Sequence, residues 1–367
     1  MSIVIERSNL LSALNKVSRA VVNNPSQPAH SCILCEYYDN KFFMRAKNTE
    51  FEIHTMVDCI QEEAGKFVVS GKLIFDIVKK SVSKDITIVV YDDEIEIKAG
   101  KSKYSLKKLD IEFPVQSLQE YNIKATLQTA DLINLVKKTA FAASTSSGTK
   151  PILEGLHLKA KDNTLTATAT DRFRVAKAQV KIDDDNDLEV IIPSNSINEL
   201  IKILNDGTVD LELNSNHALF SSREMTFETR LISGKYPDIE GVFPTEFICQ
   251  VELDGHELAQ AIDRISVMNY ETAPSLIKFS YDYAVDKVVA KLSSTENELG
   301  YTVEEFSLKN GSGLISLAIS SKYLLDALKA FNSQKITILF SGNVKPLILS
   351  SEDEPTVKQL ILPVVIK

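Results

Sequence analysis

The chain of 367 residues contains an internal repeat, and this repeat limits the possible folds more than any other feature. A serine that opens an amphipathic segment recurs as Ser70, Ser194 and Ser320, at spacings of 124 and 126 residues. A threonine-acid pair recurs at spacings of 121 and 125 residues, and an apolar residue followed by proline recurs at 123 and 126. The sequence therefore predicts three copies of a unit of about 122 residues.

Three copies fill the chain, which predicts three domains, spanning residues 1–121, 122–247 and 248–367. Each copy contains two amphipathic segments with apolar residues at helical spacing. These segments begin near a serine, threonine, aspartate or glycine that can cap a helix. The six predicted helices lie within residues 7–21, 70–84, 129–144, 193–207, 255–269 and 320–335.

Short runs between the predicted helices alternate apolar and polar residues, as strands with one solvated face do. Examples are DITIVVY, EIEIKAG, TLTATATD and TFETRLI. The order of strand, helix and several strands occurs twice in each copy. We therefore predict an α+β fold in which the two helices of each copy pack on antiparallel sheets.

The net charge of −9 argues against nucleic-acid binding if the charge is spread evenly. However, the six predicted helices together carry +7, and the rest of the chain carries −16. Helices tolerate lysine well, so a mild excess of lysine also has a purely structural interpretation. Basic helices on one side of a sheet would suit a phosphate backbone, without base readout, because the sequence shows no aromatic stacking ladder.

Cysteine and histidine usage indicates no metal site and no cofactor. The four cysteines are too few and too scattered for a disulfide framework, so we expect them to be reduced. Cys32 and Cys35 form a CxxC pair without a second pair, and the five histidines are dispersed singly. Charges and serines interrupt the apolar residues near the N-terminus, which favours a cytoplasmic protein.

The stretch ATATDRFRVAKAQV, residues 167–180, could mark a catalytic turn, a phosphate grip or plain architecture. Because its threonine-acid pair recurs in each copy, we interpret Thr170 and Asp171 as caps of a strand end. Arg172 to Arg174 belong to the second copy alone. The sequence has no Walker loop, GxGxxG or HExxH motif, so we do not expect an enzyme.

Seven fragments, in this order and spacing, resemble the bacterial sliding clamps, the beta subunits of DNA polymerase III. They are FVVSGKLIFDIVKK, KPILEGLHLKA, TATATDRFRVA, IIPSNSINELIKIL, TRLISGKYPDIEGVFP, SSKYLLDALKAF and LILPVVIK. The resemblance covers essentially the whole chain. It implies a non-catalytic processivity factor, a head-to-tail homodimer that closes into a ring around double-stranded DNA without reading its sequence. A monomeric three-domain adaptor that encloses no DNA is the alternative.

The resemblance also implies a cleft between the second and third domains that binds short hydrophobic peptides of the replicative DNA polymerase, the clamp loader and repair proteins. Its wall would consist of Leu153, Thr170, Arg172, Phe173, Arg174, Val175, Pro237, Val242, Tyr323, Pro346, Leu360, Ile361, Leu362, Pro363 and Val364. Relatives commonly carry a small residue where this chain has Arg172.

Two further residue sets follow from the resemblance. The residues expected to face DNA are Lys72, Lys79, Lys80, Lys137, Lys138, Lys150 and Lys202. The residues expected at the dimer interface are Ile77 and Tyr104 in the first copy, and Val267 and Met268 in the third.

Overall fold

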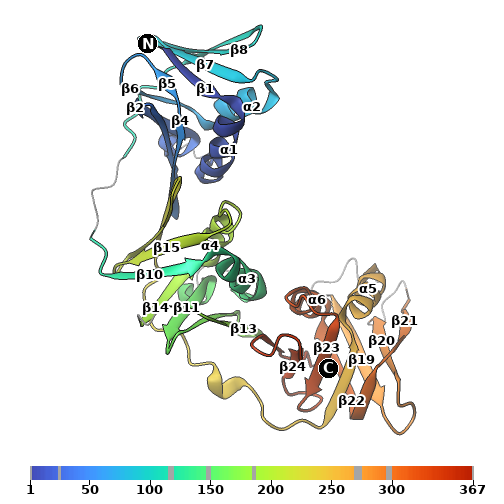
Figure 1. Cartoon of the computed structure of the whole chain (residues 1–367). Coiled ribbons are helices and arrows are strands. Elements are labelled where there is room, and N and C mark those ends of the chain that lie inside the picture. The colour runs from blue at the N-terminus through green and yellow to red at the C-terminus, as the bar shows by residue number, and fades with distance from the viewer. Residues whose placement is uncertain are drawn as a thin grey trace. The chain divides into compact units, whose positions relative to one another are not determined.

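The computed structural model describes residues 2–23, 26–114, 120–145, 150–183, 187–267, 275–294 and 300–365. Backbone contacts divide the chain into two compact units. Unit 1 comprises Met1–Ala130 and Asn198–Leu231, and unit 2 comprises Asp131–Ile197 and Ile232–Lys367. Figure 1 shows the order of the elements along the chain.

All six predicted helices are confirmed, although each is shorter than its amphipathic segment. They are α1 (Arg7–Val17), α2 (Gly71–Lys80), α3 (Thr129–Thr139), α4 (Ser194–Leu200), α5 (Gly255–Ser266) and α6 (Ser321–Lys329). Their apolar faces are buried, as Leu10 and Leu14 of α1 and Ile74 and Val78 of α2 show with side chains that are fully enclosed.

The predicted helix caps are only partly confirmed. The side chain of Asp254 accepts hydrogen bonds from the backbone N–H groups of two residues in the first turn of α5. Ser320 likewise accepts from the N–H of Tyr323 in α6. Ser70, in contrast, makes no side-chain hydrogen bond to α2, so the recurring serine is not a cap in every copy.

Unit 1 contains two antiparallel sheets. The first has the order β5 (Ile60–Gln61), β1 (Ser2–Glu6), β7 (Asp85–Val90), β8 (Glu94–Ala99) and β9 (Ser102–Lys107). The second has the order β10 (Ile123–Gln128), β15 (Thr208–Leu213), β16 (His217–Ser222), β17 (Met225–Arg230), β4 (Phe51–Asp58), β3 (Lys41–Lys47), β2 (Cys32–Tyr38) and β6 (Gly65–Ser70).

Unit 2 contains one long antiparallel sheet. Its order is β14 (Leu188–Pro193), β11 (Gly155–Lys161), β12 (Thr164–Thr170), β13 (Arg174–Lys181), β25 (Lys358–Ile361), β24 (Leu347–Ser350), β23 (Lys335–Phe340), β18 (Cys249–Asp254), β22 (Asn310–Ser320), β19 (Leu276–Asp282), β20 (Val289–Ser294) and β21 (Val303–Ser307). The predicted α+β fold with antiparallel sheets is confirmed.

The hairpin turns repeat as the sequence period predicts. Asp39 and Asn40 connect β2 to β3 with φ values of 49° and 57°. Asp162 and Asn163, 123 residues later, connect β11 to β12 with φ values of 51° and 55°. Asp and Asn tolerate positive φ better than most residues, which suits them to these tight turns.

The sheets continue across the boundaries between copies. Strand β4 of the first copy pairs with β17 of the second, and β13 of the second copy pairs with β25 of the third. In both junctions, the last strand of one three-stranded meander pairs with the last strand of a meander in the next copy. The meander β2–β3–β4 meets β15–β16–β17, and the meander β11–β12–β13 meets β23–β24–β25. The two compact units therefore do not follow the predicted domain boundaries, which stay a prediction.

The threonine-acid pair is a strand cap in the second copy but not in the first. The Oγ1 atom of Thr170 donates to the carbonyl of Arg174 at 2.6 Å. In the first copy, Asn48 Oδ1 accepts from the N–H groups of Glu50 and Phe51 at 2.8 and 3.0 Å. Asn48 lies three residues before the start of β4, as Asp171 lies three residues before the start of β13. Asn48 is thus the counterpart of Asp171, because both side chains accept hydrogen bonds at the same place before a strand. The third-copy pair lies outside the described residues.

The four cysteines are buried and none forms a disulfide. Burial raises the pKa of the Cys35 thiol. Among the described residues, no helix has both the length and the apolar character needed to cross a membrane.

Candidate functional site

Unit 2 contains a cavity of about 340 Å³, which we call the cleft. Aliphatic side chains and prolines form most of its wall, with four charged residues among them. The complete lining is Lys150, Ile152, Leu153, Thr170, Arg172, Arg174, Val175, Pro237, Asp238, Ile239, Val242, Pro346, Leu360 and Leu362. An apolar wall with few polar groups is typical of a site for a small apolar ligand or peptide anchor.

Neighbouring strands bring together parts of the wall that are far apart in the sequence. Val175 on β13 lies opposite Leu360 on β25 in the antiparallel ladder. Leu153 belongs to the 3-10 helix Pro151–Glu154, and Val242 ends the 3-10 helix Glu240–Val242. The N–H of Leu362 donates to the carbonyl of Phe173 at 2.8 Å, which places the residue after β25 beside the β12–β13 turn.

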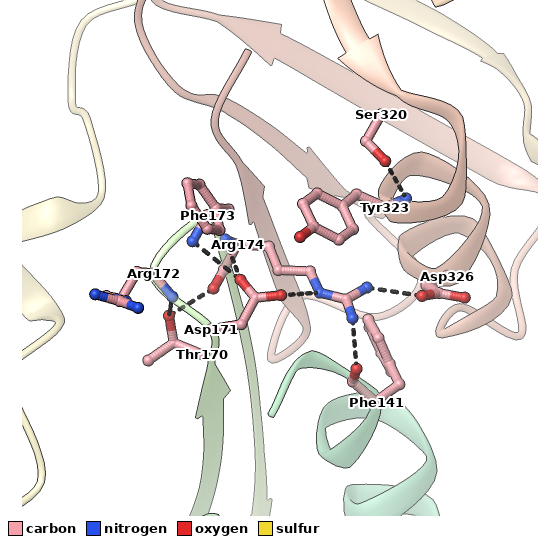
Figure 2. A network of polar contacts seen from close by, with 9 residues as sticks. All are labelled: Phe141, Thr170, Asp171, Arg172, Phe173, Arg174, Ser320, Tyr323 and Asp326. Atoms are coloured by element: carbon pink, nitrogen blue, oxygen red, sulfur yellow. Dashed lines mark hydrogen bonds and ion pairs between the residues drawn. The ribbon is translucent and has the colours of Figure 1, made fainter. Parts of the chain in front are cut away.

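Hydrogen bonds from backbone N–H groups to the side chains of Thr170 and Asp171 shape the β12–β13 turn (Figure 2). Thr170 Oγ1 accepts from the N–H of Arg172 at 3.1 Å. Asp171 Oδ1 accepts from the N–H groups of Phe173 and Arg174 at 2.9 and 3.1 Å. Thr170 and Asp171 therefore determine the backbone path without help from the side chain of Arg172.

Arg174 connects this turn to two other elements of unit 2. Its Nε donates to Asp171 Oδ2 at 3.0 Å, its Nη1 to Asp326 Oδ2 at 2.7 Å, and its Nη2 to the carbonyl of Phe141 at 2.7 Å. The guanidinium carbon also lies 4.4 Å from the centroid of the Tyr323 ring. With two carboxylates and one carbonyl around it, the charge of Arg174 is satisfied within the chain.

The cleft contains most but not all of the residues expected there. Ten expected residues line it, whereas Phe173, Tyr323, Ile361, Pro363 and Val364 are not part of the lining. Phe173 is 56% exposed at the tip of the turn, and Tyr323 packs against Arg174 instead. Burial, followed by the negative charge of Asp171, raises the pKa of Tyr323.

Sequence reasoning missed three residues of the wall, Ile152, Asp238 and Ile239. Ile152 and Asp238 lie next to residues that were expected there and Ile239 lies two positions after Pro237, so a wider window around the expected residues would have found all three. Lys150 was expected to face DNA, but it lines the cleft.

The other lysines expected to face DNA fall into two groups. Those with exposed side chains are Lys72, Lys79 and Lys80 on α2, Lys137 on α3, and Lys202 just after α4. Lys138 is only 6% exposed and forms an ion pair with Glu354. The expectation that Lys138 faces DNA is therefore wrong, because its charge is buried and neutralised inside unit 2.

The residues expected at the dimer interface also differ in exposure. Tyr104 on β9 is 36% exposed, and Val267 after α5 is 71% exposed. Ile77 on α2 is 9% exposed, so most of its side chain packs inside unit 1. Met268 lies outside the described residues.

Three copies of a module with two helices and antiparallel sheets, joined by strand pairing between copies, define the class of DNA clamps. Family models of the DNA polymerase III beta subunit match the chain over its length. The N-terminal domain matches residues 1–117, the central domain 126–238 and the C-terminal domain 240–365. The chain therefore belongs to the DNA polymerase III beta subunit family.

Known proteins agree with this assignment. The chain is 30% identical to the beta sliding clamp of Staphylococcus epidermidis and 31% identical to that of Staphylococcus aureus, with 99% of each chain covered. It is also similar to the crystal structure of the DNA polymerase sliding clamp from Bacillus subtilis, with 29% identity, a TM-score of 0.92 and complete coverage of both chains. The predicted role as a DNA polymerase processivity factor is confirmed, which fits the expectation that the chain is not an enzyme.

Proposed function

We propose that two copies of this chain close head to tail into a ring around double-stranded DNA, and that the ring tethers a replicative polymerase through the cleft. The ring would act in the cytoplasm, where a clamp loader opens it and repair proteins share the same cleft. The observation that carries this proposal is the pairing of equivalent strands at both junctions between copies.

Among the described strands, the two junctions leave one strand of each kind without a partner in another copy. The last strands of the first meander in copies one, two and three are β4, β13 and β21. The last strands of the second meander in copies one, two and three are β9, β17 and β25. Among the described strands, β9 and β21 are both sheet edges. If β21 of one subunit pairs with β9 of the next, a third junction of the same type forms, and two such contacts close a dimer.

Tyr104 supports this closure through its place in the repeat. It occupies the position of Phe227, 123 residues later, because Ile97 pairs with Tyr104 as Phe220 pairs with Phe227. Phe227 stacks on Phe51 across the first junction, with ring centroids 4.9 Å apart. Tyr104 thus presents an exposed aromatic ring where the equivalent ring is covered by the neighbouring copy.

The charges on the two free edges are complementary. Strand β9 carries Lys103 and Lys107, whereas β21 carries Glu304 and Glu305. Lys103 already pairs with a glutamate of its own sheet, and both glutamates have basic partners in unit 2. Attraction between the edges would therefore favour the correct pairing more than it would increase affinity.

Ring closure also gives a reason for the mild positive charge of the helices. A closed ring holds DNA by enclosing it, so a few exposed lysines on helices around the DNA would be sufficient. Each phosphate contact makes binding more dependent on salt, whereas enclosure of the DNA does not depend on such contacts. This favours exposed lysines such as Lys79 and Lys137 over a strongly basic surface.

Solution mass tests the ring first, and retention on DNA tests it second. Light scattering should give about twice the chain mass of 40.8 kDa. The dimer should then remain on circular DNA after loading and slip from linear DNA. A stable monomer with no preference for circles would instead support the adaptor without encirclement.

The cleft requires its own test. A short apolar peptide should bind to the chain and lose affinity when Val175→Ala and Leu360→Ala shrink the wall of the cleft. Val285→Ala, at an exposed position outside the lining, is the matched control. Equal affinity in all variants would show that the peptide binds elsewhere.

A further inference from the structure

We infer that Arg172 makes the cleft select peptides with an acidic side chain beside their apolar anchors, an inference that rests on the cleft's proposed role in binding peptides. Three observations carry it, namely the backbone of Arg172, the surroundings of its side chain and the charges around the cleft.

Arg172 has an unfavourable backbone conformation. Its φ is 82°, a region that side chains with a Cβ atom rarely adopt and that glycine adopts easily. Thr170 and Asp171 hold the turn in this shape, so a glycine at this position would satisfy the same hydrogen bonds. Local backbone geometry therefore does not explain why an arginine stands here. Strain of this kind in a binding site points to a role of the side chain.

Among the described residues, the side chain of Arg172 makes no polar contact that would hold the fold together. Figure 2 shows it extending away from Asp171, Arg174 and Asp326. Within the part of the chain that the structure describes, its guanidinium donates no hydrogen bond and forms no ion pair. Arg174, only two residues away, shows the opposite arrangement, with three side-chain hydrogen bonds. Arg172 thus keeps its charge and its donors available at the wall of the cleft.

The remaining charges of the cleft favour an anionic partner. Lys150 also lines it and, among the described residues, has no ion-pair partner. The carboxylate of Asp238 is the negative charge of the lining, and its Oδ1 already accepts from the N–H of Glu240. The available charges are therefore two cations against one partly engaged anion.

This combination defines the partner. The aliphatic wall formed by Val175, Leu360 and Leu362 accepts apolar side chains. A carboxylate one or two residues from those anchors would reach the guanidinium of Arg172, whose planar donors suit bidentate pairing with a carboxylate. The expected occupant is a short peptide segment that combines leucine-like anchors with an aspartate or glutamate.

The test compares short synthetic peptides that are acetylated and amidated, so that a side chain supplies the only carboxylate. Each carries two leucine anchors and either aspartate or asparagine at one neighbouring position. The dissociation constants are measured by fluorescence anisotropy with the full chain. For the best position we expect about a fivefold preference for aspartate at low salt, which shrinks as salt is added.

Arg172→Gln should reduce this preference to about one, whereas Arg223→Gln should leave it intact. Arg223 is an exposed arginine in the turn between β16 and β17, in unit 1, and controls for the loss of one positive charge. Arg172→Gly should have a thermal midpoint no lower than the wild type, because glycine removes the unfavourable φ. This separates an effect on binding from an effect on folding.

The possible failures differ in meaning. Peptides that bind without any preference for aspartate, or a preference that survives Arg172→Gln, would overturn the role of Arg172 and leave the cleft in place. If none of these peptides binds to the wild type, the cleft itself is not the peptide site.

Discussion

Replacing Arg174 by alanine should destabilise unit 2 severely, because this arginine is the shared partner of three groups. The substitution removes hydrogen bonds to the carboxylates of Asp171 and Asp326 and to the carbonyl of Phe141. It also removes the guanidinium that packs on the ring of Tyr323. The variant therefore loses packing and leaves two negative charges without their main partner.

The magnitude follows from the burial of these groups. The side chains of Arg174 and Asp171 are 7% and 12% exposed, and that of Asp326 is 27% exposed. Removing one partner of a buried ion pair typically costs about 3–5 kcal/mol. Because water can reach Asp326 and solvate its charge, we expect a loss near the lower end, about 3 kcal/mol. Arg174→Lys keeps the charge but lacks the planar fork, so its loss should be smaller than that of the alanine variant.

Urea denaturation followed by circular dichroism measures this loss. Two compact units need not unfold together, so the free energy is taken from the transition that Arg174→Ala displaces. Arg172→Gln is the matched control and should change the free energy of unfolding by less than about 0.5 kcal/mol. A loss below about 1 kcal/mol for Arg174→Ala would refute the reasoning, since the network would then contribute no more than an exposed ion pair.

Three further predictions concern other parts of the chain. Burial lowers the pKa of His54 from 6.5 to about 4, so the free energy of unfolding should fall by up to about 3 kcal/mol as the pH is lowered from 6.5 to 4. Urea denaturation should show a smaller loss in His54→Gln, and an equal loss in both proteins would contradict this. Lys138→Met should cost about 2 kcal/mol, because Glu354 loses its cationic partner and, among the described residues, keeps only the N–H groups of Asn332 and Ser333; Glu354→Gln should restore part of the loss, and a double-mutant cycle without coupling would exclude the buried pair. Tyr104→Ala should raise the dimer dissociation constant at least about tenfold in light scattering, whereas Tyr91→Ala, another exposed tyrosine, should not; equal constants would remove Tyr104 from the interface.

The sequence predicts the fold well because repetition makes each element visible several times. A segment such as residues 193–207 is a weak helix signal alone, and the helix there is indeed short, at Ser194–Leu200. Its position in the repeat, between one strand and the next, still predicts it correctly. The aliphatic wall of the cleft is expected for a different reason, because Val175 and Leu360 follow from the resemblance to the sliding clamps and not from the repeat; the structure places them opposite each other on paired strands.

The sequence does not reveal how individual charges are used. Lys138 is next to the exposed Lys137 on α3, and both look equally available in a linear sequence. The difference arises because the helix directs one of them at Glu354, which is more than two hundred residues away. Arg172 and Arg174 differ in the same way. One is surrounded by Asp171 and Asp326, and the other lines the cleft, which only tertiary structure can distinguish.

The two junctions between copies show why one of them carries the cleft although both have the same topology. At the first junction, Phe51 of β4 stacks on Phe227 of β17, and the hollow beside them is small, about 50 Å³, and lined largely by polar and charged residues. At the second junction, the position of Phe51 is taken by Arg174, 123 residues later, whose guanidinium is held by Asp326. The neighbouring Val175 and Leu360, which lie opposite each other, take the positions of the facing pair Glu52 and Glu228, and the space there is about 340 Å³. The exchange of a facing glutamate pair for aliphatic side chains, and of Phe51 for a tethered arginine, thus gives one junction of a repeated architecture an apolar space that, within the described residues, the other junction lacks.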